Sequence, residues 1–141
     1  MEKVEQLRVV GIGASAGGLE ALQAFFKHLP DQSGLAYVVV QHLSPDYRSM
    51  MDELLARHTR MPIHVIRDGM TLEADSVYLI PPRQNLKIYR NRLFLEKQDT
   101  GKGLNLPIDI FFRSLAEEKE KNAIGIILSG TGSDGTMGTR E

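Results

Sequence analysis

The chain has 141 residues, no cysteine and a formal net charge of -1, with 17 Lys and Arg against 18 Asp and Glu. A single domain is expected at this length, and the lack of cysteine excludes disulfides, thiolate nucleophiles and cysteine-based zinc sites. The balanced charge argues against a nucleic-acid partner, and without a signal peptide or an apolar run of ~20 residues we expect a cytoplasmic protein with no direct membrane insertion.

The first half of the chain alternates short apolar runs with helical patterns. Strands are predicted at residues 7–12 and 35–41, with a helix ending near Leu29 between them and a second helix beginning near Arg48. Such alternation is typical of βαβ units. We therefore predict an α/β fold with a doubly wound, mostly parallel sheet and helices on both faces.

The second half adds a different group of strands before the pattern returns. The runs IHVI, SVYLI, LKIY and LFLE lie within residues 63–97, and the last two, separated by residues 90–92, predict an antiparallel hairpin insertion. A helix is then predicted from Pro107, with Asp109 in its first turn where a carboxylate suits the helix dipole. A last strand is predicted at Ala123–Leu128, followed by the glycine-rich run SGTGSDGTMG.

The run GIGASAGG, which overlaps the end of the first predicted strand, has two interpretations. Read as GxGxxA from Gly11, it resembles the fingerprint that binds a dinucleotide pyrophosphate. Read as GxSxG around Ser15, it is a turn that presents a nucleophilic serine. A dinucleotide site also needs an acidic residue at the end of the second strand, and that strand ends in Gln41 and His42. The hydrolase interpretation is therefore favoured.

Three residues that could form a catalytic triad follow predicted strands. Ser15 follows the first strand, His42 the second, and Asp134 lies in the loop after the last. Because the carboxyl ends of parallel strands meet at one sheet edge, we expect all three there, with serine as nucleophile, histidine as base and aspartate orienting the histidine. Each also has a structural alternative: a helix N-cap for the serine, a surface residue for the histidine and an ordinary turn for SGTGSDG.

The backbone N–H of Ala16 is the simplest candidate donor to the oxyanion of an acyl-transfer reaction, because it precedes a predicted helix whose N-terminus is positive. The chain order Ser, His, Asp differs from the Ser, Asp, His order of lipase-like α/β-hydrolases. A different scaffold carrying the same three residues is therefore predicted.

Five motifs in order identify a family resemblance. They are GIGASAGGLEAL, VVVQHLSPDYRSMMDELLARHT, VYLIPPRQNLKI, NLPIDIFFRSLAE and IGIILSGTGSDGTMG. Together, from about Arg8 to the end of the chain, they resemble the catalytic domain of CheB-type protein-glutamate methylesterases. IPPRQNL and LNLPIDIFFRSLAE look most like the esterase module of hybrid proteins in which this module precedes a CheR-type methyltransferase.

The resemblance implies hydrolysis of γ-glutamyl methyl esters on chemoreceptors, with glutamine deamidation as a second activity and no metal or cofactor. The family's catalytic serine, histidine and aspartate fall on Ser15, His42 and Asp134, in agreement with the triad derived from the strand ends. Two neighbours depart from the commoner family pattern. Ala16 stands where threonine is frequent, and Thr131 stands where methionine often helps to form the oxyanion region.

The resemblance also sets expectations for domain organisation and partners. Residues 1–141 are expected to be a CheB-type catalytic domain that is incomplete at its C-terminus and lacks a receiver domain. A methylated chemoreceptor or similar signalling protein is the expected partner, with a CheR-type module in the same full-length protein. The alternative is a non-catalytic receptor-binding or scaffold module, for which the departures at Ala16 and Thr131 are the support.

Overall fold

The computed structural model describes residues 7–14, 18–41, 51–98 and 106–128. Five strands in these ranges form a parallel sheet in the order β3-β5-β2-β1-β8. Their bounds are β1 (Arg8–Ala14), β2 (Leu35–Gln41), β3 (Ile63–Val65), β5 (Ser76–Leu79) and β8 (Ala123–Leu128).

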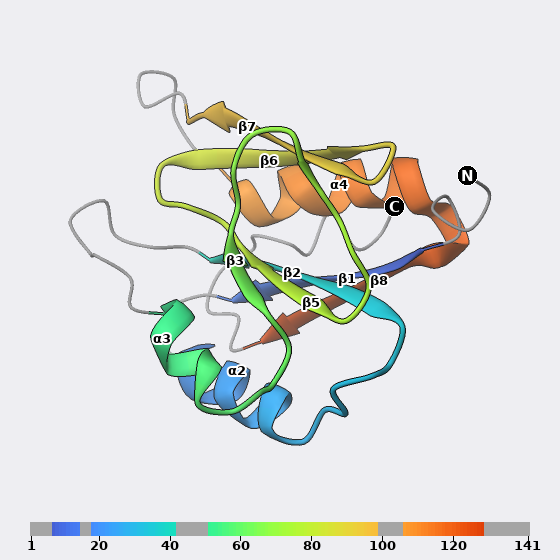
Figure 1. The fold of residues 1–141 in the computed structure, drawn as a ribbon. Helices are drawn as coiled ribbons and strands as arrows, with labels where there is room; N and C mark the ends of the chain where they lie inside the picture. The colour runs from blue at the N-terminus through green and yellow to red at the C-terminus, as the bar shows by residue number, and fades with distance from the viewer. Residues whose placement is uncertain (1–6, 15–17, 42–50, 99–105, 129–141) are drawn as a thin grey trace.

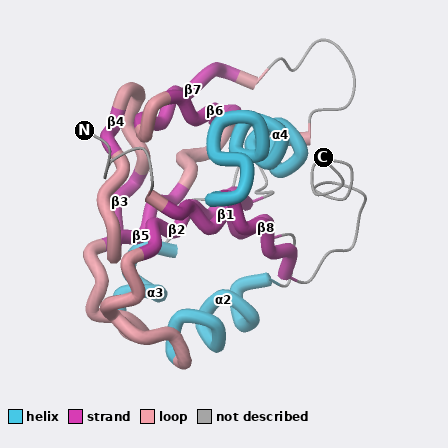
Figure 2. Tube along the Cα trace, turned by 90° about the vertical axis from the view of Figure 1, so that its right-hand side faces the viewer, coloured by secondary structure: helices cyan, strands magenta, loops and turns pink. Residues whose placement is uncertain are grey.

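The sheet is covered on both faces, as Figures 1 and 2 show. Helices α2 (Gly18–Lys27) and α3 (Met51–Ala56) lie on one face. Helix α4 (Pro107–Lys119), which the short 3-10 helix η1 (Glu120–Asn122) follows, lies on the other face together with a second sheet. The predicted doubly wound α/β fold is therefore confirmed.

The second sheet is antiparallel, with the strand order β4-β7-β6. Its strands are β4 (Met70–Thr71), β6 (Gln84–Tyr89) and β7 (Arg92–Lys97). Arg90 and Asn91, with φ of 48° and 59°, join β6 to β7. Positive φ at both central residues is the requirement of a type I′ turn, which fits the right-handed twist of a hairpin. The predicted hairpin is confirmed.

The structure corrects one prediction about this region. We expected all the short strands between residues 63 and 97 to belong to one inserted group, but β3 and β5 pair in parallel within the main sheet. All four residues of β5 are buried. A short strand that is apolar on both faces is typical of a covered parallel sheet, whereas β6 and β7 alternate between buried and exposed positions.

The core is divided by the main sheet into two layers. Successive residues of β1 alternate between them, so that Val9 packs in the layer of α4 while Val10 and Ile12 pack in the layer of α2. Helix α2 contributes Leu22 and Phe26, both fully buried, to its layer. The layer on the other face is filled from α4 by Ile108, Phe111, Phe112 and Leu115.

Gly11 and Gly13 bring α4 close to β1. A Cβ atom at Gly13 would lie 2.5 Å from Cγ2 of Ile108, and one at Gly11 would lie 2.9 Å from Cδ2 of Leu115. Both glycines lie inside the strand and pair with β2 on one side and β8 on the other. In a dinucleotide fingerprint the glycines form the turn after the strand. Helix packing therefore accounts for these two glycines without a bound pyrophosphate.

Tyr78 of β5 ties the main sheet to the chain that follows β4. Its buried hydroxyl accepts a hydrogen bond from the Glu73 N–H at 2.8 Å and donates one to the Thr71 carbonyl at 3.4 Å. Its ring stacks on His64 of β3 at 5.2 Å. Burial, as the largest cause, raises the pKa of the Tyr78 hydroxyl above its ordinary value of 10.0.

We expect Tyr78→Phe to lower the free energy of unfolding by about 1 to 2 kcal/mol, because the Glu73 N–H loses its acceptor. The unfolded chain ionises at Tyr78 near pH 10, while the folded chain keeps the proton to higher pH. This site therefore stabilises the fold fully below pH 10 and progressively less above it. Urea unfolding at pH 8 and pH 11 measures this effect. The free energy of unfolding should differ less between the two pH values in Tyr78→Phe than in the wild type. The exposed-site variant Tyr89→Phe should match the wild type at both.

Candidate functional site

Three strand ends meet at one edge of the main sheet. Ala14, the last residue of β1, pairs with Gln41 at the end of β2 and with Leu128 at the end of β8. Neighbouring strands of a sheet lie about 4.8 Å apart. The three carboxyl ends therefore stand side by side, with that of β1 in the middle.

This edge coincides with a reversal of the chain's path through the sheet. From β1 the chain passes through α2 to β2 on one side, and it later places β8 on the other side of β1. In open α/β sheets such a reversal leaves a crevice beyond the carboxyl ends of the two flanking strands, where ligands bind. The ends of β1 and β8 mark that position here.

The residues predicted for the site lie outside the described residues. These are the triad candidates Ser15, His42 and Asp134 and the oxyanion candidates Ala16 and Thr131. The described strand ends nevertheless test one premise of the prediction. Ser15 is the next residue after Ala14, and His42 is the next residue after Gln41, so both follow strand ends that are register partners. The premise that these strands end at a common edge is confirmed, while the roles of the five residues stay predictions.

Asp109 lies near this edge, and its burial was not predicted from the sequence. Its neighbour Ile108 contacts Gly13, so the first turn of α4 lies beside the end of β1. Asp109 is 4% exposed, although a carboxylate that only complements a helix dipole needs no burial. A carboxylate is rarely buried without partners. The sequence signal for this burial was the run LPIDIFF, because the apolar residues on both sides of Asp109 place it on the side of the helix that faces the core.

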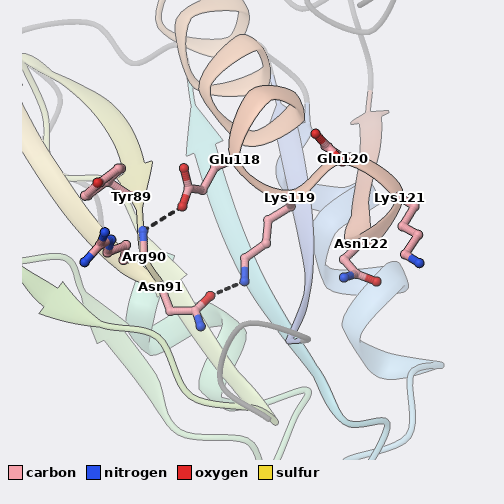
Figure 3. Close-up of a pocket in the computed structure, with 8 residues that line it drawn as sticks. All are labelled: Tyr89, Arg90, Asn91, Glu118, Lys119, Glu120, Lys121 and Asn122. Atoms are coloured by element: carbon pink, nitrogen blue, oxygen red, sulfur yellow. Dashed lines mark hydrogen bonds between the residues drawn. The ribbon is translucent and has the colours of Figure 1, made fainter. Parts of the chain in front are cut away.

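A cavity of about 340 Å³ lies at the opposite end of α4 (Figure 3). The Nζ of Lys119 donates a hydrogen bond to Oδ1 of Asn91, and both side chains are buried. Glu118 Oε1 accepts a hydrogen bond of 2.9 Å from the Arg90 N–H. These contacts fix the β6–β7 turn to the end of α4, so we interpret this cavity as part of a structural junction. Its lining residues are Tyr89, Arg90, Asn91, Glu118, Lys119, Glu120, Lys121 and Asn122.

Within the four described ranges, no helix is long and apolar enough to cross a membrane. No group of three or more His, Asp or Glu side chains in those ranges is placed to hold a metal ion.

The fold and the position of these strand ends define a class of protein. It is a doubly wound α/β protein whose candidate site lies at a topological switch point, with a serine directly after β1 in the sequence. Comparison with known proteins then gives the family. The family model described as CheB methylesterase matches residues 10–141, so the chain belongs to the CheB methylesterase family.

Individual relatives agree with this assignment. The chain is 38% identical over 138 residues to a protein-glutamate methylesterase/protein-glutamine glutaminase 2 of Xanthomonas oryzae, which covers 95% of this chain and 38% of that protein. It is 48% identical over 88 residues to an uncharacterized 104.1 kDa protein of Rhodobacter capsulatus, covering 62% of this chain and 9% of that protein. The chain thus spans well under half the length of either relative.

A solved structure resembles the whole described fold. The crystal structure of the Thermotoga maritima CheB methylesterase catalytic domain superposes with a TM-score of 0.82 at 28% sequence identity. The match covers 95% of this chain and 73% of that domain. The predicted fold class and the predicted family resemblance are both confirmed.

Proposed function

We propose that this chain is a protein-glutamate methylesterase that hydrolyses γ-glutamyl methyl esters and releases methanol. The observation that supports the proposal is the register of the strand ends, which pairs Ala14 at the end of β1 with Gln41 at the end of β2. Ser15 and His42 are the next residues after these two in the sequence. Membership of the CheB methylesterase family supports the same chemistry.

In the first half-reaction, the hydroxyl oxygen of Ser15 attacks the ester carbon while His42 accepts its proton. Collapse of the tetrahedral intermediate breaks the bond to the methoxy oxygen, which takes that proton from His42 and leaves as methanol. Asp134 holds the imidazole in the required tautomer and stabilises its charged form. The product is an acyl-enzyme joined through Ser15.

In the second half-reaction, His42 removes a proton from water, which attacks the acyl carbon. The bond from that carbon to the Ser15 oxygen then breaks, the serine oxygen takes the proton back from His42, and the glutamic acid product leaves as its carboxylate after losing a proton to solvent. The backbone N–H of Ala16 is proposed to stabilise the oxyanion in both steps, with Thr131 contributing to the oxyanion region. An amide carbonyl passes through the same intermediates with ammonia as leaving group. Deamidation of glutamine is therefore the second activity proposed for this site, in keeping with the glutaminase name of the Xanthomonas relative.

The proposed substrate is a methylated chemoreceptor or a similar signalling protein, and the proposed location is the cytoplasm. Residues 1–141 are proposed to act as a CheB-type catalytic module beside a CheR-type methyltransferase in a longer protein. The match to a small part of a 104.1 kDa relative supports a module of this kind within a large chain.

The experiment that tests this function is methanol release from a receptor fragment methylated by a CheR-type methyltransferase. We expect the initial rate of methanol release to be proportional to the concentration of this chain, and we expect no methanol from the unmethylated fragment. Binding of the fragment without methanol release would support the scaffold alternative instead. Labelling by a fluorophosphonate probe provides a second readout, because such probes modify activated serines.

A further inference from the structure

The outer face of the β6–β7 hairpin presents aromatic and basic side chains to solvent. Leu86, Ile88 and Leu93 point toward the core, so the alternating residues point away from it. The exposed side chains are Lys87, Tyr89, Arg92 and Phe94, with Arg90 at the turn. We call these five residues the hairpin face.

The aromatic and basic side chains are interleaved. Tyr89 pairs across the hairpin with Arg92, and Lys87 pairs with Phe94. The guanidinium carbon of Arg90 lies 5.4 Å from the centre of the Tyr89 ring. Tyr89 is 54% exposed and Phe94 is 38% exposed, so two rings on adjacent strands are open to water on one face. Tyrosine, phenylalanine and arginine are the residue types that protein interfaces favour.

The edge of β6 is already occupied. The Ile88 N–H donates to Oγ of Ser114 at 2.9 Å, and that hydroxyl also lies 3.3 Å from the Ile88 carbonyl, to which it donates. The Arg90 N–H donates to Glu118 at 2.9 Å. These contacts from α4 satisfy the groups with which an added strand would pair. A partner would therefore dock on the hairpin face rather than extend the sheet.

The hairpin face carries three cations, and the carboxylates near it are Glu96, two register pairs beyond Phe94 on the outward side of β7, and Glu118, which accepts the Arg90 N–H. Such a surface complements a segment that carries both carboxylates and apolar side chains. Nucleic acid fits it less well, because its affinity depends on many phosphate contacts and the chain as a whole has a net charge of -1.

We infer that the hairpin face is an exosite for an acidic, amphipathic segment of the protein substrate. This inference rests on the proposed function, because a methyl-accepting substrate bears glutamates in its modified region. The contacts Ile88 to Ser114 and Arg90 to Glu118 show that β6 runs along α4 toward its C-terminal end. Since a 13-residue helix is roughly 20 Å long, the face lies well away from the strand ends of the candidate site.

The test measures substrate binding separately from chemistry. The two double variants are Lys87→Glu with Arg92→Glu, and Tyr89→Ser with Phe94→Ser. We expect each to raise KM for the methylated receptor fragment by about 10-fold and to leave kcat unchanged, because the exosite binds substrate before and during the reaction alike. Hydrolysis of a small glutamyl methyl ester, which cannot reach the hairpin face, should not change.

Matched controls exclude general effects of surface charge and polarity. Arg57→Glu reverses an exposed charge just after α3, on the other face of the main sheet, and Val65→Ser removes an exposed apolar side chain from β3. Both should leave KM unchanged. If the hairpin variants shift KM no more than these controls, the inference is wrong.

A direct binding measurement separates this inference from the esterase proposal. Fluorescence anisotropy would measure the binding of a labelled amphipathic peptide that has glutamates and leucines on one helical face. The binding of a second peptide, with lysines in place of the glutamates, would be measured in the same way. We expect binding of the acidic peptide alone, weakened about 10-fold by both double variants, whether or not the chain releases methanol. Equal binding of both peptides, or tighter hairpin-dependent binding of a single-stranded oligonucleotide, would overturn the assignment.

Discussion

Ser15→Ala is expected to reduce the rate of methanol release by roughly 10⁴- to 10⁶-fold, because it removes the atom that forms the acyl-enzyme. The variant keeps the backbone donors and the binding surface, so KM for the receptor fragment should change little. The same substitution should abolish labelling by a fluorophosphonate probe. Steady-state kinetics and mass spectrometry of the labelled protein measure the two effects.

A second serine provides the control for this variant. Ser33 precedes β2, at the end of the sheet away from the candidate site, and its hydroxyl lies 2.7 Å from that of Tyr37. Ser33→Ala should retain the wild-type kcat and the labelling. If Ser15→Ala released methanol at more than about one hundredth of the wild-type rate, another nucleophile would have to carry the reaction.

Gly13→Ala is expected to lower the free energy of unfolding by about 2 to 3 kcal/mol. The added methyl group would lie 2.5 Å from Cγ2 of Ile108, a distance that real Cβ atoms essentially never show. Helix α4 must move away from β1 or rearrange its packing to accommodate it. Urea denaturation monitored by circular dichroism measures the loss.

A double-mutant cycle tests the cause of that loss. Ile108→Ala is destabilising alone because it leaves a cavity, but in its presence Gly13→Ala should cost close to zero, which gives a coupling energy of about 2 kcal/mol. Gly34→Ala is the control. Gly34 has a φ of 78° with no atom near its Cβ position, so its cost of about 1 kcal/mol should be the same in both backgrounds. An equal cost of Gly13→Ala in both backgrounds would exclude close helix approach as the reason for this glycine.

Much of the fold followed from local patterns. The strand at Leu35–Gln41 and the strand at Ala123–Leu128 have their predicted bounds, because continuous β-branched and apolar runs are typical of strands in a parallel sheet. The first of them is buried, whereas the second is partly exposed at the edge of the described sheet. The helix from Pro107 was marked by its proline and by apolar residues at helical spacing.

The errors arose where tertiary contacts override local signals. The first strand was predicted to end at Ile12 but continues to Ala14, because Gly13 accommodates a helix instead of forming a turn. Strand β4 was missed, since two residues, Met70 and Thr71, carry no periodic pattern of their own. Strands β3 and β5 were predicted to belong to the inserted group but pair within the main sheet, because a short apolar run does not reveal which strand it pairs with.

The candidate site was predicted through topology rather than through spacing in the sequence. Three loops could be expected at one edge because parallel strands align their carboxyl ends, and the pairing of Ala14 with Gln41 and Leu128 confirms that alignment. The burial of Asp109 was missed, since it depends on which side of α4 meets the sheet. The roles of Ser15, His42 and Asp134 stay predictions, which the methanol-release experiments described above are designed to test.

The pairing of β1 with β8 has a consequence for how the protein matures during synthesis. Val9 pairs with Ala123, so β1 lacks its neighbour on that side until residue 123 and the rest of β8 have left the ribosome. Contacts so distant in sequence form late and slow the folding reaction. Asp134 comes after β8 in the sequence, so a nascent chain cannot complete the proposed triad before β8 has been synthesised. The proposed esterase activity would therefore appear only after β8 has joined the sheet.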